Sequence, residues 1–201
     1  MTPLPRKIVM ASGNAGKLRE IERILADFEV EIVPQSEFGV SDADETGTTF
    51  VENALLKARH AVDATGLPAI ADDSGLVVDA LNGEPGVYSA RYAGPGATDS
   101  ENNDKLLSAL DGLPDEQRGA TFHCVVCFVR PGDSEPVIAT GEWRGRILHE
   151  RQGEGGFGYD PLFFVSEANC SVAELASAEK NRCSHRGKAL RALARKLRGD
   201  D

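Results

Sequence analysis

A polar loop near the N-terminus combines the residue types that bind phosphate. It follows the apolar run 7–11 and precedes a segment whose apolar residues recur at helical spacing. Its residues are Ser12, Gly13, Asn14, Ala15, Gly16 and Lys17. Glycine lets a phosphate approach the backbone, the N-terminus of a helix attracts anions, and a lysine adds a full charge. The sequence therefore indicates a phosphate-binding loop, with an ordinary strand-to-helix connection as the alternative. The loop is too short for the P-loop pattern.

Three acidic residues have the chemistry to bind a hard divalent cation. Asp72 and Asp73 follow the short apolar run 69–71, and Glu45 lies in an acidic turn further upstream. Adjacent carboxylates raise each other's pKa unless solvent, hydrogen bonds or a cation hold them apart. Mg²⁺ prefers such oxygen ligands. These positions predict a magnesium site, with an Asx-turn at the aspartates and a solvated turn at Glu45 as the structural alternatives.

A second glycine-rich loop, at residues 153–161, carries Phe157 and Tyr159. Exposed aromatic rings can stack on a nucleobase, because every base has a flat π-face. A buried hydrophobic plug is the alternative interpretation of the same residues. The loop is therefore a candidate for base binding.

Three potential cations, Lys180, His185 and Arg186, fall where we expect the last helix to start. Positive charge at a helix N-terminus opposes the helix dipole and does not stabilise the helix. This placement favours a functional explanation over a stabilising one.

Alternating helices and strands must position these residues. Thr49 and Glu52 form a capping-box pattern that predicts the start of a helix, and Gly66 predicts its end. Residues 69–71 read as a buried strand that ends at the aspartates. A helix is expected around 101–110, an antiparallel pair at 120–130 and 136–148, and a final helix after the last cationic segment. This order predicts a mixed-sheet α/β protein forming one large domain or two closely joined lobes.

The composition limits the classes of partner. The net charge of −10 would repel a nucleic acid polymer, and no contiguous basic stripe offsets it. A small anionic substrate is compatible if a few cations and a divalent metal gather at one site. No apolar run is long enough to span a bilayer, and residues 1–7 lack the apolar stretch of a secretory signal. We therefore expect a cytoplasmic protein without a membrane partner.

The four cysteines predict neither a disulfide framework nor a zinc site. Cys124 and Cys127 form a C-x-x-C within a strand-like run. Residues three apart on a strand point to opposite faces, so the two thiols cannot readily share a metal. No second pair is present to complete a zinc site. We expect both to be small core residues.

A series of motifs runs through nearly the whole chain. They are Ser12-Gly13-Asn14-x-x-Lys17, then Glu45-Thr46-Gly47-x-Thr49-Phe50-x-Glu52-Asn53-Ala54-x-x-Lys57-Ala58, then Ala71-Asp72-Asp73-Ser74-Gly75-Leu76, then Pro85-Gly86-Val87-Tyr88-Ser89-Ala90-Arg91-Tyr92, then Gly156-Phe157-Gly158-Tyr159-Asp160-Pro161, and last Lys180-Asn181-x-x-Ser184-His185-Arg186. In this order they resemble the inosine triphosphate pyrophosphatases, also called dITP/XTP pyrophosphatases. Several motifs are long, so the resemblance is specific.

The resemblance implies an elongated mixed α/β fold with two lobes around a central nucleotide-binding cleft, with residues 1–201 as a single pyrophosphatase domain in a homodimer. It implies Mg²⁺-dependent hydrolysis of purine nucleoside triphosphates such as ITP, dITP and XTP to the monophosphate and pyrophosphate. By position, Asp73 would be the catalytic base and a metal ligand, Glu45 a second metal ligand, and Ser74 would assist residues 12–17 in holding the triphosphate. The base and phosphate pocket would comprise Phe157, Gly158, Tyr159, Asp160, Lys180, His185 and Arg186.

Two other functions would use the same residues. A nucleotidyl- or phosphotransferase needs an acceptor pocket, which the sequence does not identify. A nucleotide-sensing module without turnover would gain little from three carboxylates near an anion unless they held a metal. Magnesium-dependent release of free monophosphate together with free pyrophosphate separates hydrolysis from both alternatives.

Overall fold

The protein combines helices with one mixed sheet. The computed structural model describes residues 5–25 and 30–199. Its helices and strands are β1 (Lys7–Met10), α1 (Ala15–Leu25), β2 (Glu31–Pro34), α2 (Phe50–Thr65), β3 (Ala69–Val78), α3 (Asp99–Ala109), β4 (Gly119–Val129), β5 (Val137–Ile147), β6 (Phe163–Val165), β7 (Cys170–Ser171), α4 (Ser177–Cys183) and α5 (His185–Arg198). The seven strands follow the order β2-β1-β3-β4-β5-β6-β7. β1 is parallel to β2 and β3, and β6 is antiparallel to β5 and β7. The predicted mixed-sheet α/β class is confirmed.

The chain divides into two compact units. The first comprises Met1–Asp73, Cys124–Gly141 and His185–Asp201, and the second comprises Ser74–His123 and Glu142–Ser184. β3, β4 and β5 contribute residues to both. Among the described residues, no helix is both long enough and apolar enough to cross a membrane.

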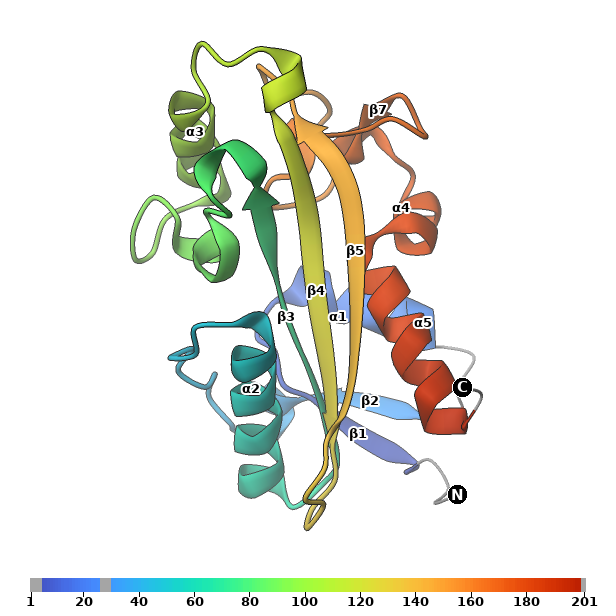
Figure 1. The fold of residues 1–201 in the computed structure, drawn as a ribbon. Helices are drawn as coiled ribbons and strands as arrows, with labels where there is room; N and C mark the ends of the chain where they lie inside the picture. The colour runs from blue at the N-terminus through green and yellow to red at the C-terminus, as the bar shows by residue number, and fades with distance from the viewer. Residues whose placement is uncertain (1–4, 26–29, 200–201) are drawn as a thin grey trace. The chain divides into compact units, whose positions relative to one another are not determined.

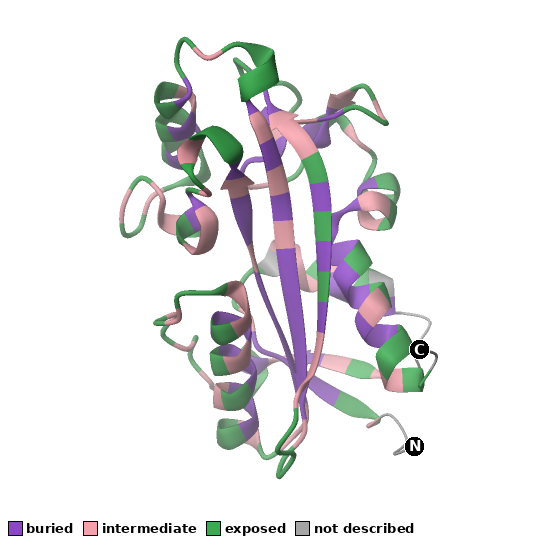
Figure 2. Cartoon of the chain, in the orientation of Figure 1, coloured by how far each residue is buried: buried purple, intermediate pink, exposed green. Residues whose placement is uncertain are grey.

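In the first unit, helices cover both faces of the strands. α2 packs on one face, and α1 and α5 pack together on the other (Figure 1). Cys124 and Phe128 of β4 face α1 and α5, whereas Val125 and Cys127 face α2. This alternation follows from the two-residue period of a strand, and β4 is buried along this stretch (Figure 2). The prediction that the two cysteines lie on opposite faces is confirmed.

The second unit has its own core, to which α3 contributes Leu106 and the residue after the helix contributes Leu110. Arg118, the residue before β4, is 1% exposed. Its Nη1 donates to the carbonyl of Leu110 at 2.7 Å, and its Nε and Nη2 donate to the carbonyls of Ile147 and Leu148, each at 2.8 Å. Because these carbonyls replace the water that a guanidinium would otherwise bind, the arginine can be buried and still tie the C-terminal end of α3 to the end of β5.

The boundaries of α2 agree with the sequence prediction. The hydroxyl of Thr49 accepts the N–H of Glu52 at 3.2 Å, and the carboxylate of Glu52 accepts the N–H of Thr49 at 3.1 Å. Gly66 ends the helix in a left-handed conformation at φ 68°, which a residue without a side chain adopts without strain. The capping box and the terminal glycine are confirmed.

Two other boundaries differ from the prediction. β3 runs without interruption from Ala69 to Val78, so the strand does not end at Asp72 and no Asx-turn forms there. The cationic segment does not open a single last helix: Lys180 lies in the last turn of α4, and Ser184 separates it from α5 in an extended conformation, φ −64° and ψ 156°. Lys180 is thus near a helix C-terminus, where a positive charge is favourable.

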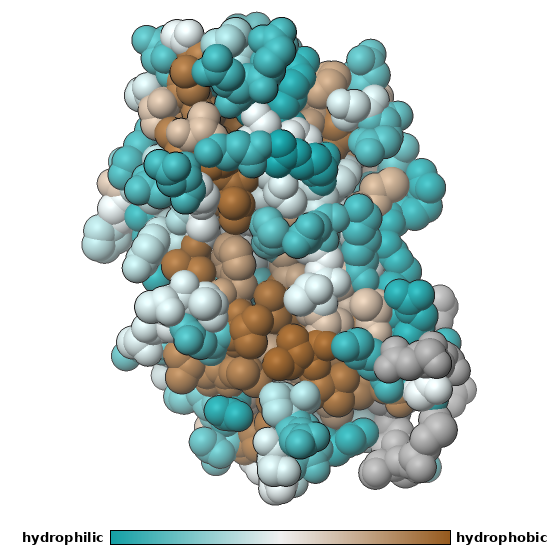
Figure 3. Space-filling model, in the orientation of Figure 1, coloured by the Kyte–Doolittle hydropathy of each residue, from teal (hydrophilic) through white to brown (hydrophobic). Residues whose placement is uncertain are grey.

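An apolar region lies on the surface of the first unit. In the space-filling view, hydrophobic residues gather over α2 and the neighbouring strands, whereas most of the remaining visible surface is polar (Figure 3). Val51, Leu55 and Ile138 are partly exposed apolar residues on the α2 side of the sheet. Contiguous apolar surface of this kind is typical of contact sites.

Candidate functional site

The predicted phosphate loop connects β1 to α1 and is organised by Asn14. The N–H of Asn14 donates to Ser12 Oγ at 3.2 Å. Asn14 Oδ1 accepts the N–H of Gly16 at 2.9 Å and that of Lys17 at 3.1 Å, so the side chain caps the first turn of α1. A Cβ on Gly13 would lie 2.7 Å from Asp42 Oδ2, so a larger residue at this position would displace the Asp42 side chain. The N–H groups of Gly16 and Lys17, which we expected to bind an anion, therefore donate to the side chain of Asn14. An anion bound at this loop would take the place of Asn14 Oδ1 as their acceptor.

Lys17 belongs to a buried charge network centred on Asp72. Its Nζ lies 3.1 Å from Asp72 Oδ2, and Arg186 Nε lies 3.3 Å from the same oxygen. Arg186 also forms an ion pair with Glu20 of α1. The side chains of Asp72 and Arg186 are 0% and 3% exposed. Burial alone would lower the pKa of Arg186, but the carboxylate of Asp72 and the other neighbouring groups outweigh it and raise that pKa, so the guanidinium stays charged.

Asp73 belongs to a second cluster, on the α2 side of β3. Lys57 Nζ lies 2.9 Å from Asp73 Oδ1 and 2.8 Å from Glu45 Oε1. Asn53 Nδ2 donates to Asp73 Oδ2 at 3.3 Å, and Asn53 Oδ1 accepts the N–H of Gly47 at 2.8 Å. Asn53 and Lys57 are one turn apart on α2, so one helix face presents both to the strand.

Burial and the neighbouring charges shift the pKa values of Asp73 and Lys57 in this second cluster. Burial raises the pKa of Asp73, and the positive charge of Lys57 opposes this only in part. Burial would lower the pKa of Lys57, but the carboxylates of Asp73, Asp72 and Glu45 outweigh it and raise that pKa. The lysine therefore stays protonated beside a carboxyl group that has more proton affinity than an exposed aspartate.

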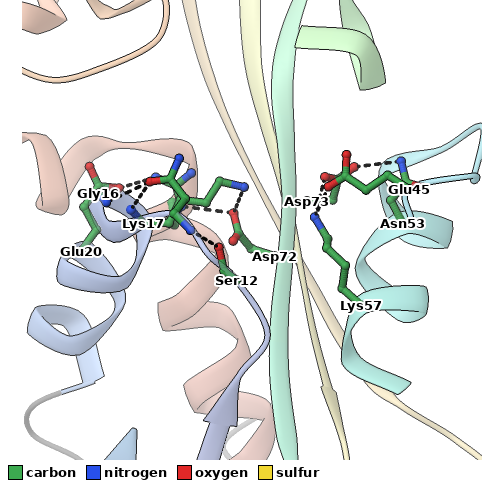
Figure 4. Close-up of polar contacts among 11 residues, drawn as sticks. Ser12, Gly16, Lys17, Glu20, Glu45, Asn53, Lys57, Asp72 and Asp73 are labelled. Carbon is green, nitrogen blue, oxygen red and sulfur yellow. Dashed lines mark hydrogen bonds and ion pairs between the residues drawn. The ribbon is translucent and has the colours of Figure 1, made fainter. Parts of the chain in front are cut away.

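The two adjacent aspartates lie on opposite faces of β3. Figure 4 shows Asp72 pointing toward Lys17 and Asp73 pointing toward Lys57. Neighbouring residues of a strand alternate between faces, and β3 does not end here. The sequence suggested that the two carboxylates would crowd each other, but each has its own cationic partner. They therefore belong to two different clusters.

The second cluster fits a divalent cation. Glu45 Oε1 and Asp73 Oδ1 converge on one positively charged atom, Lys57 Nζ, at 2.8 and 2.9 Å. Hard carboxylate oxygens are the ligands that Mg²⁺ prefers. Within residues 5–25 and 30–199, no group of three or more acidic, histidine or cysteine side chains gathers to form a complete cage. A pair of carboxylates is how Mg²⁺ is usually held when water and substrate phosphates complete its shell.

The second unit contains the glycine-rich aromatic loop. Asp160 Oδ2 accepts the N–H of Phe157 at 2.9 Å and Lys180 Nζ at 2.7 Å. The same ammonium group lies 4.4 Å from the centre of the Phe157 ring. Phe157 is half-buried, whereas Tyr159 is 4% exposed and its hydroxyl donates to the carbonyl of Ser89 at 2.8 Å. Tyr159 is thus a core residue, and Phe157 is the ring of this loop that keeps exposed surface.

The comparisons with known proteins identify the family. The model of the Ham1 family matches residues 8–196. This chain belongs to the Ham1 family. It is 58% identical over 193 residues to the dITP/XTP pyrophosphatase of Vibrio parahaemolyticus, and the aligned residues make up 96% of each chain.

Two solved structures agree with this identification. The HAM1 protein from Coxiella burnetii is 50% identical, with a TM-score of 0.89 over 97% of this chain and 100% of that one. The nucleoside-triphosphatase / dITP/XTP pyrophosphatase from Mycobacterium abscessus is 45% identical, with a TM-score of 0.74 over 93% and 97%. The resemblance found in the motifs is therefore confirmed.

Within this Ham1 protein, the predicted site residues fall into separate groups. Lys17 and Arg186 share Asp72, and Glu45 and Asp73 share Lys57. Phe157, Asp160 and Lys180 form a group in the second unit. Ser74 is the half-buried residue that follows Asp73 on β3, and His185 is a 6% exposed residue at the start of α5.

Sequence reasoning missed Asn53, Lys57 and Glu20 as members of these groups. Asn53 and Lys57 had a signal, because both are polar and occupy the same helical face as the buried residues Ala54 and Ala58. Polar residues at core-facing positions of a helix require buried partners. Glu20 had no comparable signal, because it is one of several charged residues on α1.

Proposed function

We propose that this protein hydrolyses non-standard purine nucleoside triphosphates such as ITP, dITP and XTP to the monophosphate and pyrophosphate. Relatives named for this activity match nearly the whole chain. The observation that carries the proposal is that the carboxylates of Glu45 and Asp73 lie together, at 2.8 and 2.9 Å from the ammonium group of Lys57. A triphosphate needs positive charge close to a base, and this cluster supplies a carboxylate base in a place suited to a cation.

The proposed roles divide between two sets of residues. Residues 12–17 and Ser74 bind the triphosphate, with Lys17 neutralising phosphate charge. Glu45 and Asp73 hold Mg²⁺, which when bound neutralises phosphate oxygens and the leaving pyrophosphate. Asp73 accepts the proton of the attacking water. Its buried position raises its pKa, which makes it a stronger base than an exposed aspartate once it is deprotonated.

The purine is proposed to contact Phe157, whose half-buried ring retains a surface for stacking. Gly158, Tyr159, Asp160 and Lys180 hold the loop that presents this ring. We propose that Arg186, whose guanidinium is held by Asp72 and Glu20, acts through Asp72 on the position of Lys17. We propose that His185, a member of the expected base pocket, contacts the keto side of the base.

Base selectivity follows from hydrogen-bond donors and acceptors. ITP and XTP present a 6-keto oxygen and a protonated N1, whereas ATP presents a 6-amino group and a bare N1. Donors placed for the keto oxygen would face the amino hydrogens of adenine, and such a mismatch rejects a substrate by about 10⁴-fold in a favourable site. GTP shares the 6-keto edge, so its 2-amino group must be excluded. Because XTP carries a 2-keto oxygen there, the pocket must disfavour a donor and not merely bulk.

A panel of nucleotides tests the proposal. ITP, dITP, XTP, GTP and ATP are each incubated with the protein and Mg²⁺, and monophosphate and pyrophosphate are quantified. We expect ITP and XTP to be hydrolysed far faster than ATP, weak hydrolysis of GTP, and loss of activity when EDTA removes the metal. Similar rates on ITP and ATP would contradict the proposal. Pyrophosphate without a matching amount of free monophosphate would indicate a nucleotidyltransferase, and a nucleoside diphosphate product would indicate a phosphotransferase.

We also propose that the protein is a cytoplasmic homodimer with no nucleic acid or membrane partner. The partly exposed apolar region around Val51, Leu55 and Ile138 is suited to contact with a second copy. All four cysteines are free thiols, which is typical of a reducing compartment. The net charge of −10 disfavours binding to nucleic acid or to anionic lipid. Light scattering coupled to size-exclusion chromatography tests the dimer: a monomeric mass at micromolar concentration would contradict it.

A further inference from the structure

Helix α3 lies outside every motif described above, yet its side chains hold the aromatic loop. The N–H of Gly158 donates to Asp99 Oδ2 at 2.7 Å. The carbonyl of the same glycine accepts Asn103 Nδ2 at 2.9 Å. Asp99 and Asn103 are one turn apart on α3, and Asn103 is 3% exposed. One helix face therefore holds both peptide groups of Gly158.

These contacts determine the backbone on both sides of Phe157. The peptide that follows Phe157 is held through the N–H of Gly158 by Asp99, and the peptide that precedes it is held through the N–H of Phe157 by Asp160 at 2.9 Å. Gly158 itself has a left-handed backbone, φ 61°, which glycine adopts without strain. With both flanking peptides held, the direction of the Phe157 ring depends on few remaining rotations.

The same helix holds a second loop by an analogous contact. Asn102 Oδ1 accepts the N–H of Ala93 at 2.7 Å, and its Nδ2 donates to the carbonyl of Ala90 at 3.2 Å. This loop also contains Ser89, whose carbonyl accepts the Tyr159 hydroxyl at 2.8 Å. Two consecutive asparagines of α3 thus hold two loops that also contact each other.

α3 is well suited to this role because both of its ends are anchored. At its start, Thr98 and Glu101 form a reciprocal capping box. At its end, the carbonyl of Leu110 accepts Arg118 Nη1 at 2.7 Å in the core. Hydrogen bonds to such a helix restrict the loop to one position, whereas a glycine-rich loop without them would sample many conformations.

We infer that Asp99 and Asn103 are positioning residues that determine base selectivity by orienting Phe157. The inference rests on the proposed function in that Phe157 is taken to contact the base. Neither residue needs to touch the nucleotide. Each acts through the backbone of Gly158. Losing either contact lets the ring leave the orientation that holds the base in register with the hydrogen-bonding groups that select it.

The test compares Asp99→Ala and Asn103→Asp with Asp104→Ala. Asn103→Asp keeps the size of the buried side chain but replaces the donor to Gly158 with an acceptor. Asp104 is on the same helix and pairs with Arg151 at 2.8 Å on the surface, so Asp104→Ala removes an acid from α3 but leaves both contacts to Gly158 in place. Asp99→Asn, which retains an oxygen acceptor for the Gly158 N–H, serves as the conservative rescue.

Two measurements are made on each full-length variant. Hydrogen exchange detected by mass spectrometry, without nucleotide, follows the peptides that cover residues 153–161. Steady-state kinetics give kcat and KM for ITP and ATP. We expect Asp99→Ala and Asn103→Asp to speed exchange in this loop and to lower the ITP-to-ATP ratio of kcat/KM about tenfold, mainly through KM for ITP, the scale of one charge-assisted hydrogen bond. Asp99→Asn should recover most of the ratio, and Asp104→Ala should match the wild type.

Unchanged exchange in both loop variants would overturn the inference, as would equal losses on ITP and ATP. Failure of the proposed function is distinguishable. If the wild-type protein releases no pyrophosphate from any nucleotide, the proposed activity is wrong, while the exchange experiment still reports whether α3 holds the loop.

Discussion

Replacing Arg186 with leucine should destabilise the protein far more than the loss of a surface ion pair. The Arg186 side chain is 3% exposed and that of Asp72 is 0% exposed, and Arg186 also pairs with Glu20. The Arg186→Leu variant approximately keeps the volume of the side chain but removes the guanidinium beside Asp72, whose buried carboxylate still lies 3.1 Å from Lys17 Nζ. A buried charge that loses a partner recovers little hydration, so the lost interaction is not replaced by water.

The magnitude follows from this burial. Removing one partner of a buried ion pair lowers the free energy of unfolding by roughly 3–5 kcal/mol. Because Lys17 still neutralises part of the charge on Asp72, we expect about 3 kcal/mol, the lower end of that range. For a chain of this size, each kcal/mol lowers Tm by roughly 2–4 °C, so Tm should fall by about 6–12 °C.

Urea unfolding followed by circular dichroism measures the effect. The matched control is Arg144→Leu, because Arg144 pairs with Asp79 on the surface, where their side chains are 60% and 51% exposed. That variant should lose less than about 1 kcal/mol. The double variant Asp72→Leu/Arg186→Leu removes the buried carboxylate as well, and it should be more stable than Arg186→Leu alone.

The reasoning is refuted if Arg186→Leu loses no more stability than Arg144→Leu. It is also refuted if the double variant shows the sum of the two single losses, because then the two side chains do not interact. Either result would mean that Arg186 is not what keeps Asp72 in the core.

Four further predictions concern single residues. Asp73→Asn should lower pyrophosphate release from ITP by at least about 10²-fold while leaving the circular dichroism spectrum unchanged; near-wild-type turnover would remove Asp73 from the mechanism. Lys17→Ala should weaken triphosphate binding about ten- to a hundredfold, seen as a rise in KM, the scale of one charge-assisted contact; an unchanged KM and kcat would mean that its loop does not bind phosphate. Phe157→Ala should lower kcat/KM more for ITP than for ATP, and equal losses would mean that Phe157 does not contribute to base selectivity. Burial raises the pKa of Cys124 and Cys127 to about 12 each, so mass spectrometry should find neither thiol alkylated by iodoacetamide in the native protein at neutral pH; rapid labelling of either would show that it is not buried.

Local rules were enough to predict much of the fold. The capping pair Thr49 and Glu52 and the terminal Gly66 delimit α2 through contacts within a few residues, so their pattern is visible in the sequence. The opposite orientations of Cys124 and Cys127 follow from the period of a strand, which does not depend on the rest of the chain. The motifs identified the family because the types and order of their residues can be compared without knowing the structure.

The charge pairs of the site were decided only by the tertiary structure. Arg186 reaches Asp72 across 114 positions and Glu20 across 166, and Asp99 reaches Gly158 across 59. No periodicity or spacing rule specifies partners at such separations, because the path of the chain determines them. The same reason explains the wrong boundary at Asp72: the local preference of aspartate for a turn is weak, and β3, which lies between β1 and β4 in the sheet, continues through Asp72 to Val78. Sequence therefore specified which residue types are present and which face of an element each takes, whereas the packing of distant elements determined which charges meet.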